Sequence, residues 1–166
     1  DQFIDFTSGR EGTFYDGGAL GLAHTDMTEP YCTSLRSRLS VIAQAHGLEV
    51  IPRGTYACFN GPRFETAAEI RMHAMLGGDV VGQTGVPEAA LARELGIHYA
   101  AVAVSINWAA GLDASEHGLA VDLSDMEAKR ATLLKVFIET LRADLTITCN
   151  CGHAILFHFN KPEEQG

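Results

Sequence analysis

The chain has 166 residues, of which 46% are apolar and 8% aromatic, and this is long enough for one domain with a substantial core. Its formal net charge is −9, and no cluster of lysines and arginines offsets it, which argues against a nucleic-acid partner. The longest apolar run, residues 99–106, is too short to span a membrane, and residues 1–5 lack the basic start of a signal peptide. We therefore expect neither a membrane nor a nucleic-acid partner.

Residues 1–28 are rich in Gly, Thr and Asp, and we expect loops there with one short strand at residues 19–24. Glu29-Pro30 predicts the start of a helix, because proline suits the first helical turn, and Gly47 predicts its end. Leucine, isoleucine and alanine recur at helical spacing between these two points. Two strand segments are predicted next, at residues 48–51 and 55–59.

The following part of the chain alternates helices with strands. One helix is predicted from Thr66 to a Gly-Gly stop, and another from Pro87 to Gly96. Two apolar strand segments lie between and after them, at residues 79–83 and 98–105. The second is a near-continuous apolar run, typical of a strand buried on both faces. This alternation is the pattern of the α/β class.

A last long helix is predicted after Ser124, which together with Glu127 has the spacing of a capping box. Its apolar side chains recur on one stripe, and we expect that stripe to face the core. The stripe consists of Leu133, Leu134, Phe137, Ile138 and Leu141. Residues 1–166 are expected to form a single domain whose tail, residues 156–166, frays.

Four cysteines are too few, and too unevenly spaced, for the disulfide framework of a small secreted protein, which favours a cytoplasmic setting. Cys149, Cys151 and His153 form a Cys-x-Cys-x-His pattern that is compatible with a small metal or redox module. Zinc sites usually pair two ligand doublets, and the sequence offers no second doublet. We therefore expect no metal ion, and we keep the metal or redox module as a third interpretation.

Two predicted junctions between a strand and a helix carry polar side chains. The first leads from Asn60 to Glu65, and the second contains Gln83 and Thr84. In open α/β sheets, ligands bind at the edge formed by the carboxyl ends of the strands. Phe64 beside Glu65 places an aromatic face next to a carboxylate, which suggests a flat, hydrogen-bonding ring as the ligand. From the pattern alone, an ordinary loop is an equally good interpretation.

The sequence resembles the trimeric nucleoside phosphorylases, a family that includes 5′-methylthioadenosine, methylthioinosine and 6-oxopurine nucleoside phosphorylases. The resemblance runs from the first residue to about Ile155, in one order and at near-constant spacing. It is carried by Asp-Gln-Phe-Ile-Asp at residues 1–5, Gly-Thr-Tyr at 54–56, Gly-Pro-Arg-Phe-Glu-Thr-Ala-Ala-Glu at 61–69, Gly-Gln-Thr-Gly-Val-Pro-Glu-Ala-Ala-Leu-Ala-Arg-Glu at 82–94, Asn-Trp-Ala-Ala-Gly at 107–111 and Cys-x-Cys-x-His-Ala at 149–154.

The resemblance implies an α/β domain with a mixed, partly barrel-like sheet flanked by helices. It also implies a pentosyltransferase of purine salvage that acts as a homotrimer. The implied reaction is phosphorolysis of a 6-oxopurine nucleoside, or of its methylthio analogue methylthioinosine, to the free base and a pentose 1-phosphate. Phosphate is the co-substrate in this reaction, and no other cofactor is implied.

By this resemblance, Phe64 packs on the base and Glu65 accepts the N1–H of hypoxanthine or guanine. The adenine-cleaving relatives lack that carboxylate. Asn107 matches a base-contacting residue that resembles Asn in the 6-oxopurine group and Asp in the methylthioadenosine group, and we expect it to be the catalytic residue that donates toward O6 or N7. Adenine presents an acceptor at N1, so Glu65 would face a lone pair. The alternative for Asn107 is a turn residue after a strand.

Further positions complete the implied site. Thr84 matches a residue that contacts phosphate and ribose, and Gln83 stands where the family usually has a methionine against the sugar. His24 matches a residue that reaches toward the 5′ end of the nucleoside in an adjacent subunit, although a lone histidine is as often an ordinary surface residue. The family's 5′ pocket is apolar in methylthio-selective enzymes, and the matching residues favour a 5′-methylthio substrate. These residues are Val121, Leu119 and Leu123.

The family's phosphate-holding residues are a glycine-rich loop, an Arg-His pair and a threonine, and they precede the segment with which this chain begins. We therefore expect a carboxyl-terminal part of such an enzyme, without its N-terminal strands. Of the phosphate-binding residues only Thr84 is then present, so we expect the isolated chain to be inactive, since holding the anion contributes much of the rate. The alternative is a truncated relative that binds a purine, or only subunit partners, without turnover.

Overall fold

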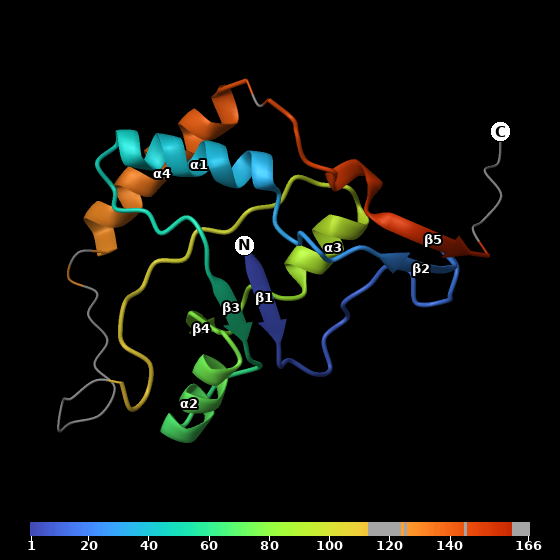
Figure 1. Cartoon of the computed structure of the whole chain (residues 1–166), viewed down its shortest axis with the longest axis horizontal. Helices are drawn as coiled ribbons and strands as arrows, with labels where there is room; N and C mark the ends of the chain where they lie inside the picture. The colour runs from blue at the N-terminus through green and yellow to red at the C-terminus, as the bar shows by residue number, and fades with distance from the viewer. Residues whose placement is uncertain (113–123, 125, 145, 161–166) are drawn as a thin grey trace.

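The computed structural model describes residues 1–112, 124, 126–144 and 146–160, and its elements alternate as the α/β class predicts (Figure 1). The strands are β1 (Gln2–Asp5), β2 (Leu22–Thr25), β3 (Thr55–Cys58), β4 (Val80–Gly82) and β5 (Ile155–Phe159). The helices are α1 (Thr33–Ala45), α2 (Ala67–Met75), α3 (Glu88–Glu94) and α4 (Met126–Arg142), with a 3-10 turn η1 at Cys151–His153.

The described strands form two separate sheets. One is parallel, in the order β1-β3-β4, and the other is an antiparallel pair of β2 and β5. The predicted mixture of strand directions in an α/β fold is confirmed, although each sheet has one kind of pairing. Figure 1 shows the β2–β5 pair extending from the body of the molecule on the side opposite α4 and away from α2.

The main core lies between α1 and α4, which Figure 1 shows side by side. Val136 of α4 is its most buried member, with 1% of its surface exposed. It packs with Leu39, Ile42 and Ala43 of α1. Leu48 and Val50 pack against this cluster from an irregular segment. The strand predicted at residues 48–51 is therefore wrong, because these side chains fill the core without a neighbouring strand.

Helix α1 begins at Thr33, later than Glu29-Pro30 predicts. Cys32 is its N-cap, and the Cys32 sulfur accepts a hydrogen bond from the Leu35 N–H at 3.4 Å. The preceding Tyr31 is buried and stacks on Tyr99, with ring centroids 6.0 Å apart. The residues before Cys32 form bends instead of a helical turn, and a local helix signal cannot reveal the tertiary contact that Tyr31 makes there.

The apolar stripe of α4 does not face the described core. The buried residues of this helix are Val136 and Thr140, whereas Leu141 on the stripe is 84% exposed. Leu134, Phe137 and Ile138 are exposed as well. Helix α1 covers the face that carries Val136, so the prediction of a buried stripe is wrong for four of its five residues, whereas Leu133 is half-buried. Among the described residues, no helix combines the length and apolar character needed to cross a membrane.

Residues 98–105 form no strand, contrary to the prediction. Their chain is irregular, and Val102 is 43% exposed. A strand requires a hydrogen-bonded neighbour along its length. In the described chain this segment accepts one such bond near its start, from the Cys32 N–H to the Tyr99 carbonyl at 2.8 Å. The apolar run indicates a preference for burial, but it does not determine which strand lies beside it.

The tail is more ordered than the sequence predicts. We expected fraying from residue 156, yet Ile155–Phe159 forms β5 and pairs with β2, with Phe157 opposite His24. Three of these five residues are β-branched or aromatic, which favours a strand once a partner is present. The prediction of a frayed tail is therefore wrong for residues 156–159.

Candidate functional site

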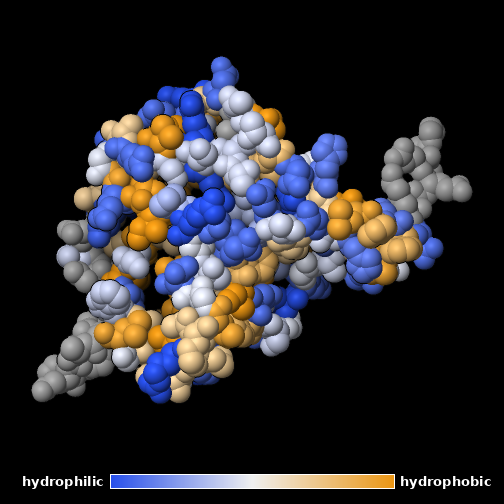
Figure 2. All heavy atoms as spheres, in the orientation of Figure 1, coloured by the Kyte–Doolittle hydropathy of each residue, from blue (hydrophilic) through white to orange (hydrophobic). Residues whose placement is uncertain are grey.

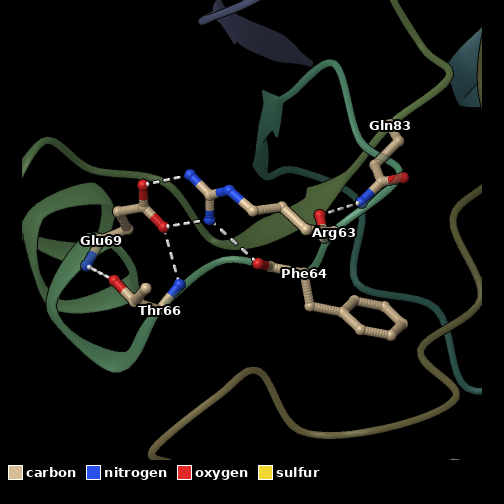
Figure 3. A network of polar contacts seen from close by, with 5 residues as sticks. All are labelled: Arg63, Phe64, Thr66, Glu69 and Gln83. Carbon is tan, nitrogen blue, oxygen red and sulfur yellow. Dashed lines mark hydrogen bonds and ion pairs between the residues drawn. The ribbon is translucent and has the colours of Figure 1, made fainter.

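The two loops singled out by the sequence leave the parallel sheet at the same edge. Strands β3 and β4 pair in parallel, with Cys58 opposite Gly82, so the loops to α2 and α3 begin side by side. The Gln83 side-chain amide donates to the Arg63 carbonyl at 3.0 Å and joins the loops (Figure 3). Gly61 has a φ of +67°, and a Cβ there would overlap the Gln83 side chain. Glycine is therefore required at this crossing.

Arg63 and Glu69 lock the start of α2. The Arg63 guanidinium donates to both Glu69 carboxylate oxygens, at 2.8 and 2.9 Å, in a bidentate ion pair. Glu69 also accepts from the Thr66 N–H at 2.7 Å, and Thr66 Oγ1 accepts from the Glu69 N–H at 3.2 Å, which completes a capping box. These bonds from Arg63 and from Thr66 lower the pKa of Glu69 to about 2. The Arg63 guanidinium thus stabilises the start of α2 through its ion pair with Glu69.

This lock is expected to make stability depend on pH. The pKa of Glu69 falls from 4.5 to about 2 in the folded chain, so its contribution is fully present above pH 4.5 and is lost as the pH falls through about 2. We expect wild type to resist urea better than Glu69→Gln at neutral pH. The difference in the free energy of unfolding between the two proteins should narrow steadily as the pH falls from 4.5 to about 2. Arg63→Met should show the same narrowing. A gap that stays constant over this window would contradict the prediction.

Phe64 and Glu65 lie on the loop that this lock holds. The Phe64 ring points away from the Arg63–Glu69 pair and is 60% exposed, so its face is available for stacking (Figure 3). Glu65 is 9% exposed, and its buried Oε1 has no hydrogen-bond partner among the described residues. A buried carboxylate oxygen without a donor is costly, which marks it as a place where a ligand supplies one.

Tyr56 holds the backbone of the second loop in place through its hydroxyl group. Its hydroxyl oxygen accepts from the Thr84 N–H at 3.2 Å and from the Gly85 N–H at 3.4 Å. A Cβ on Gly82 would overlap the Tyr56 hydroxyl, so the close approach of ring and backbone requires glycine. The Thr84 side chain is exposed at this edge. Tyr56 is a positioning residue that the sequence analysis did not identify.

Arg10 is a second residue that sequence reasoning missed. Its guanidinium donates to the Gln83 carbonyl at 2.9 Å, to the Phe59 carbonyl at 3.3 Å and to the Val86 carbonyl. One side chain therefore ties the ends of β3 and β4 together. The available signal was an arginine in a polar turn shortly after β1, but the contact spans 73 residues to Gln83. No local pattern predicts a contact of that range.

Asn107 lies in the irregular segment after residues 98–105. It is half-buried, and its side-chain amide donates to the Trp108 carbonyl at 2.8 Å. A Cβ on Gly111, which has a φ of +78°, would lie 2.5 Å from the Ala67 Cβ. The segment after Asn107 therefore runs against the first turn of α2, two residues beyond Glu65. The loops that carry Glu65 and Gln83 thus lie at one end of the parallel sheet, and the segment after Asn107 approaches this end at Gly111.

The remaining predicted residues are not brought to this edge. His24 is exposed on β2, with its ring 6.0 Å from the Phe159 ring, and Figure 1 shows the β2–β5 pair well apart from α2. Val121, Leu119 and Leu123 lie outside the described residues. One hollow of about 360 Å³ lies elsewhere, between the end of α3 and residues 151–155, and it does not include Phe64 or Glu65.

Comparison with known proteins agrees with this fold and these motifs. A family model described as the phosphorylase superfamily matches residues 1–142. The chain belongs to the phosphorylase superfamily. It is 49% identical over 148 residues to 6-oxopurine nucleoside phosphorylase of Pyrococcus furiosus, an alignment that covers 85% of this chain and 55% of that protein. It is 44% identical over 156 residues to a probable S-methyl-5′-thioinosine phosphorylase of Methanothermobacter thermautotrophicus, covering 93% of this chain and 52% of that protein.

Solved structures of the superfamily share the fold. Methylthioadenosine phosphorylase from Schistosoma mansoni in complex with adenine superposes with a TM-score of 0.76 at 30% sequence identity. That match covers 84% of this chain and 55% of the Schistosoma chain. The chain therefore spans about half the length of the relatives that it matches.

Proposed function

We propose that this phosphorylase-superfamily chain supplies the purine-binding side of an enzyme that cleaves 6-oxopurine nucleosides with phosphate. The observation that carries the proposal is the buried, partnerless Oε1 of Glu65 beside the exposed ring of Phe64. A 6-oxopurine has an N1–H donor that fits this oxygen, whereas adenine offers a lone pair at N1. The base would stack on Phe64 while Glu65 fixes its Watson–Crick edge.

In the proposed reaction, a phosphate oxygen forms a bond to C1′ of the sugar as the bond between C1′ and N9 breaks. The electron pair of the broken bond moves onto the purine, which takes up the proton that the hydrogen phosphate gives up and leaves as the free base. Catalysis requires groups that stabilise this growing negative charge. The Asn107 amide is assigned to that role at O6 or N7, and Thr84 to the phosphate and ribose. Gln83 is assigned to the sugar.

The names of the sequence relatives support a 6-oxopurine base. Those described above at 44% and 49% identity are called a thioinosine and a 6-oxopurine nucleoside phosphorylase, whereas the adenine complex comes from a structure at 30% identity. We accordingly propose methylthioinosine or inosine as the substrate, and we assign Val121 to the 5′ pocket. Phosphate is the proposed co-substrate, and the reaction needs no further cofactor. The proposed location is the cytoplasm. The alternative remains a relative that binds purine, or only subunit partners, without turnover.

We further propose a homotrimer in which His24 reaches a neighbouring subunit's nucleoside. Its strand carries exposed apolar side chains, and Figure 2 shows apolar atoms gathered over the β2–β5 end of this face. The exposed residues there are Leu22, Leu156, Phe157 and Phe159. Exposed apolar surface of this kind is typical of an interface. Light scattering should then give a trimer, and a monomer at micromolar concentration would remove His24 from the site.

The function is tested by phosphate-dependent release of hypoxanthine from inosine and from methylthioinosine. The assay compares the chain alone with a fusion to the unmatched part of the Pyrococcus furiosus relative. We expect the fusion to release hypoxanthine only when phosphate is present, and the chain alone to turn over far more slowly. Release of adenine from methylthioadenosine at an equal rate would contradict the 6-oxopurine assignment. If the fusion binds hypoxanthine in calorimetry but does not cleave the nucleosides, that result would favour the non-catalytic alternative.

A further inference from the structure

Four metal-ligating side chains meet at a place that is separate from the purine edge. Cys32, His98, Cys149 and Cys151 each direct one ligand atom into a cluster in which all four atoms lie within 4.8 Å of one another. Cys32 and Cys151 are buried, and His98 and Cys149 are half-buried. The sequence shows only the Cys-x-Cys doublet, and the fold supplies the second pair of ligands from two distant segments.

The spacing within the cluster fits a tetrahedral metal ion. His98 Nδ1 lies 3.4 Å from the Cys32 sulfur and 3.3 Å from the Cys149 sulfur. Zinc bonds of about 2.3 Å to sulfur and about 2.0 Å to nitrogen place tetrahedral ligand atoms about 3.5–3.8 Å apart. Shifts of less than about 1 Å would therefore convert the cluster into a regular site, which side-chain rotation can supply.

The backbone around the cluster is held by bonds that do not involve the four side chains. The Cys32 N–H donates to the Tyr99 carbonyl at 2.8 Å, which fixes the Cys32 segment beside the residue after His98. The Thr148 N–H donates to Ser34 Oγ at 3.0 Å, which ties the Cys149 segment to the first turn of α1. The ligands are thus brought together by the fold, a pre-organisation that favours metal binding.

We propose that Cys32, His98, Cys149 and Cys151 form a structural zinc site. Three sulfurs and one imidazole are a donor set that suits zinc and excludes the hard cations magnesium and calcium. All four coordination positions come from the protein, so no position is open for a water or a substrate, as in structural sites. On binding, the three thiols release their protons to solvent, and the Nδ1 lone pair of His98 completes the coordination.

The His153 of the Cys-x-Cys-x-His pattern is not a member of the cluster. It is exposed, whereas His98 after α3 occupies the fourth position. The proposal therefore departs from the expectation of no metal ion, and its ligand set differs from the Cys149, Cys151 and His153 of the third interpretation. It also provides a matched pair of histidine variants, because His98→Gln removes a ligand and His153→Gln removes only the histidine that the local pattern suggests.

The test is metal analysis of the whole chain, prepared under reducing conditions and titrated with zinc and, separately, with cobalt. We expect one zinc ion per chain, a rise in melting temperature on adding zinc, and the visible absorption of tetrahedral cobalt together with thiolate charge-transfer bands. His98→Gln should weaken zinc binding more than about 100-fold, since loss of even an outer-shell partner costs about 10- to 100-fold. His153→Gln should bind like wild type.

A rescue variant guards against simple misfolding. His98→Cys replaces nitrogen by sulfur and should retain zinc, with a cobalt spectrum shifted toward that of a four-thiolate site. If the fully reduced chain takes up neither zinc nor cobalt, or if His153→Gln loses the metal as completely as His98→Gln, the proposal is overturned. A Cys149–Cys151 disulfide that persists under reductant, detected by mass spectrometry, would likewise overturn it.

Discussion

Glu65→Ala is expected to weaken hypoxanthine binding by about 10- to 100-fold, because a hydrogen bond to a charged group contributes about 1.5–3 kcal/mol. The wild-type oxygen is buried and has no partner among the described residues, and we propose that the N1–H of the base supplies the missing donor. Glu65→Gln should lose nearly as much, since the neutral amide is a weaker acceptor and brings an unwanted donor. Calorimetry with hypoxanthine, guanine and adenine measures this change in affinity. The prediction rests on the proposed function.

A reversal of base preference is the stricter form of this prediction. Glu65→Ser combined with Asn107→Asp should favour adenine, because the carboxylate at 107 accepts where the wild-type amide donates. Glu49→Gln is the matched control, as Glu49 is an exposed carboxylate outside the two loops. Binding of adenine by wild type as tight as that of hypoxanthine would show that Glu65 and Asn107 are wrongly assigned.

Arg93→Met is expected to lower the free energy of unfolding by about 3 kcal/mol, since removing one partner of a buried polar network leaves the others unpaired. Arg93 is 2% exposed in α3. Its Nε donates to the Asp26 carbonyl at 3.0 Å, and its guanidinium donates to Asn150 Oδ1 at 2.9 Å. This one side chain therefore joins α3 to the end of β2 and to the turn before Cys151.

Urea unfolding followed by circular dichroism measures this loss. Arg93→Lys should fall between wild type and Arg93→Met, because an ammonium cannot reproduce the two-pronged geometry of the guanidinium. Arg71→Met on the exposed face of α2 is the control and should change stability by less than about 0.5 kcal/mol. Equal stability of the Arg93 and Arg71 variants would show that the buried network contributes nothing.

The local elements of the site were predictable because their signals lie within a few residues. The start of α2 at Thr66, the glycine stop of α2 and the strand-to-helix junctions after β3 and β4 are all present as the sequence predicts, and the structure adds the Thr66–Glu69 capping box. Each depends on backbone groups that a nearby side chain satisfies. The same logic placed Phe64, Glu65, Gln83 and Thr84 on two loops, although their roles toward a purine remain proposals.

Predictions that depended on a distant neighbour were wrong or absent. The apolar run at residues 98–105 and the stripe on α4 indicated burial, but whether an element covers them is decided by the rest of the fold. Residues 156–159 were predicted to fray, but they pair with β2, a partner that lies more than a hundred residues earlier and that no local pattern identifies. A hydrophobic pattern states a preference and does not specify the surface that satisfies it.

The sequence by itself determined the family resemblance, the start of α2 near Thr66 and the two loops that carry the candidate purine site, because these features depend on short contiguous segments. Only the tertiary structure revealed Arg10 bridging to Gln83 across 73 residues and His98 beside Cys32 and Cys149 across 66 and 51 residues. Such contacts form when packing and hydrogen bonding offset the entropy of closing long loops. That balance is a property of the whole fold, and a local sequence pattern does not contain it.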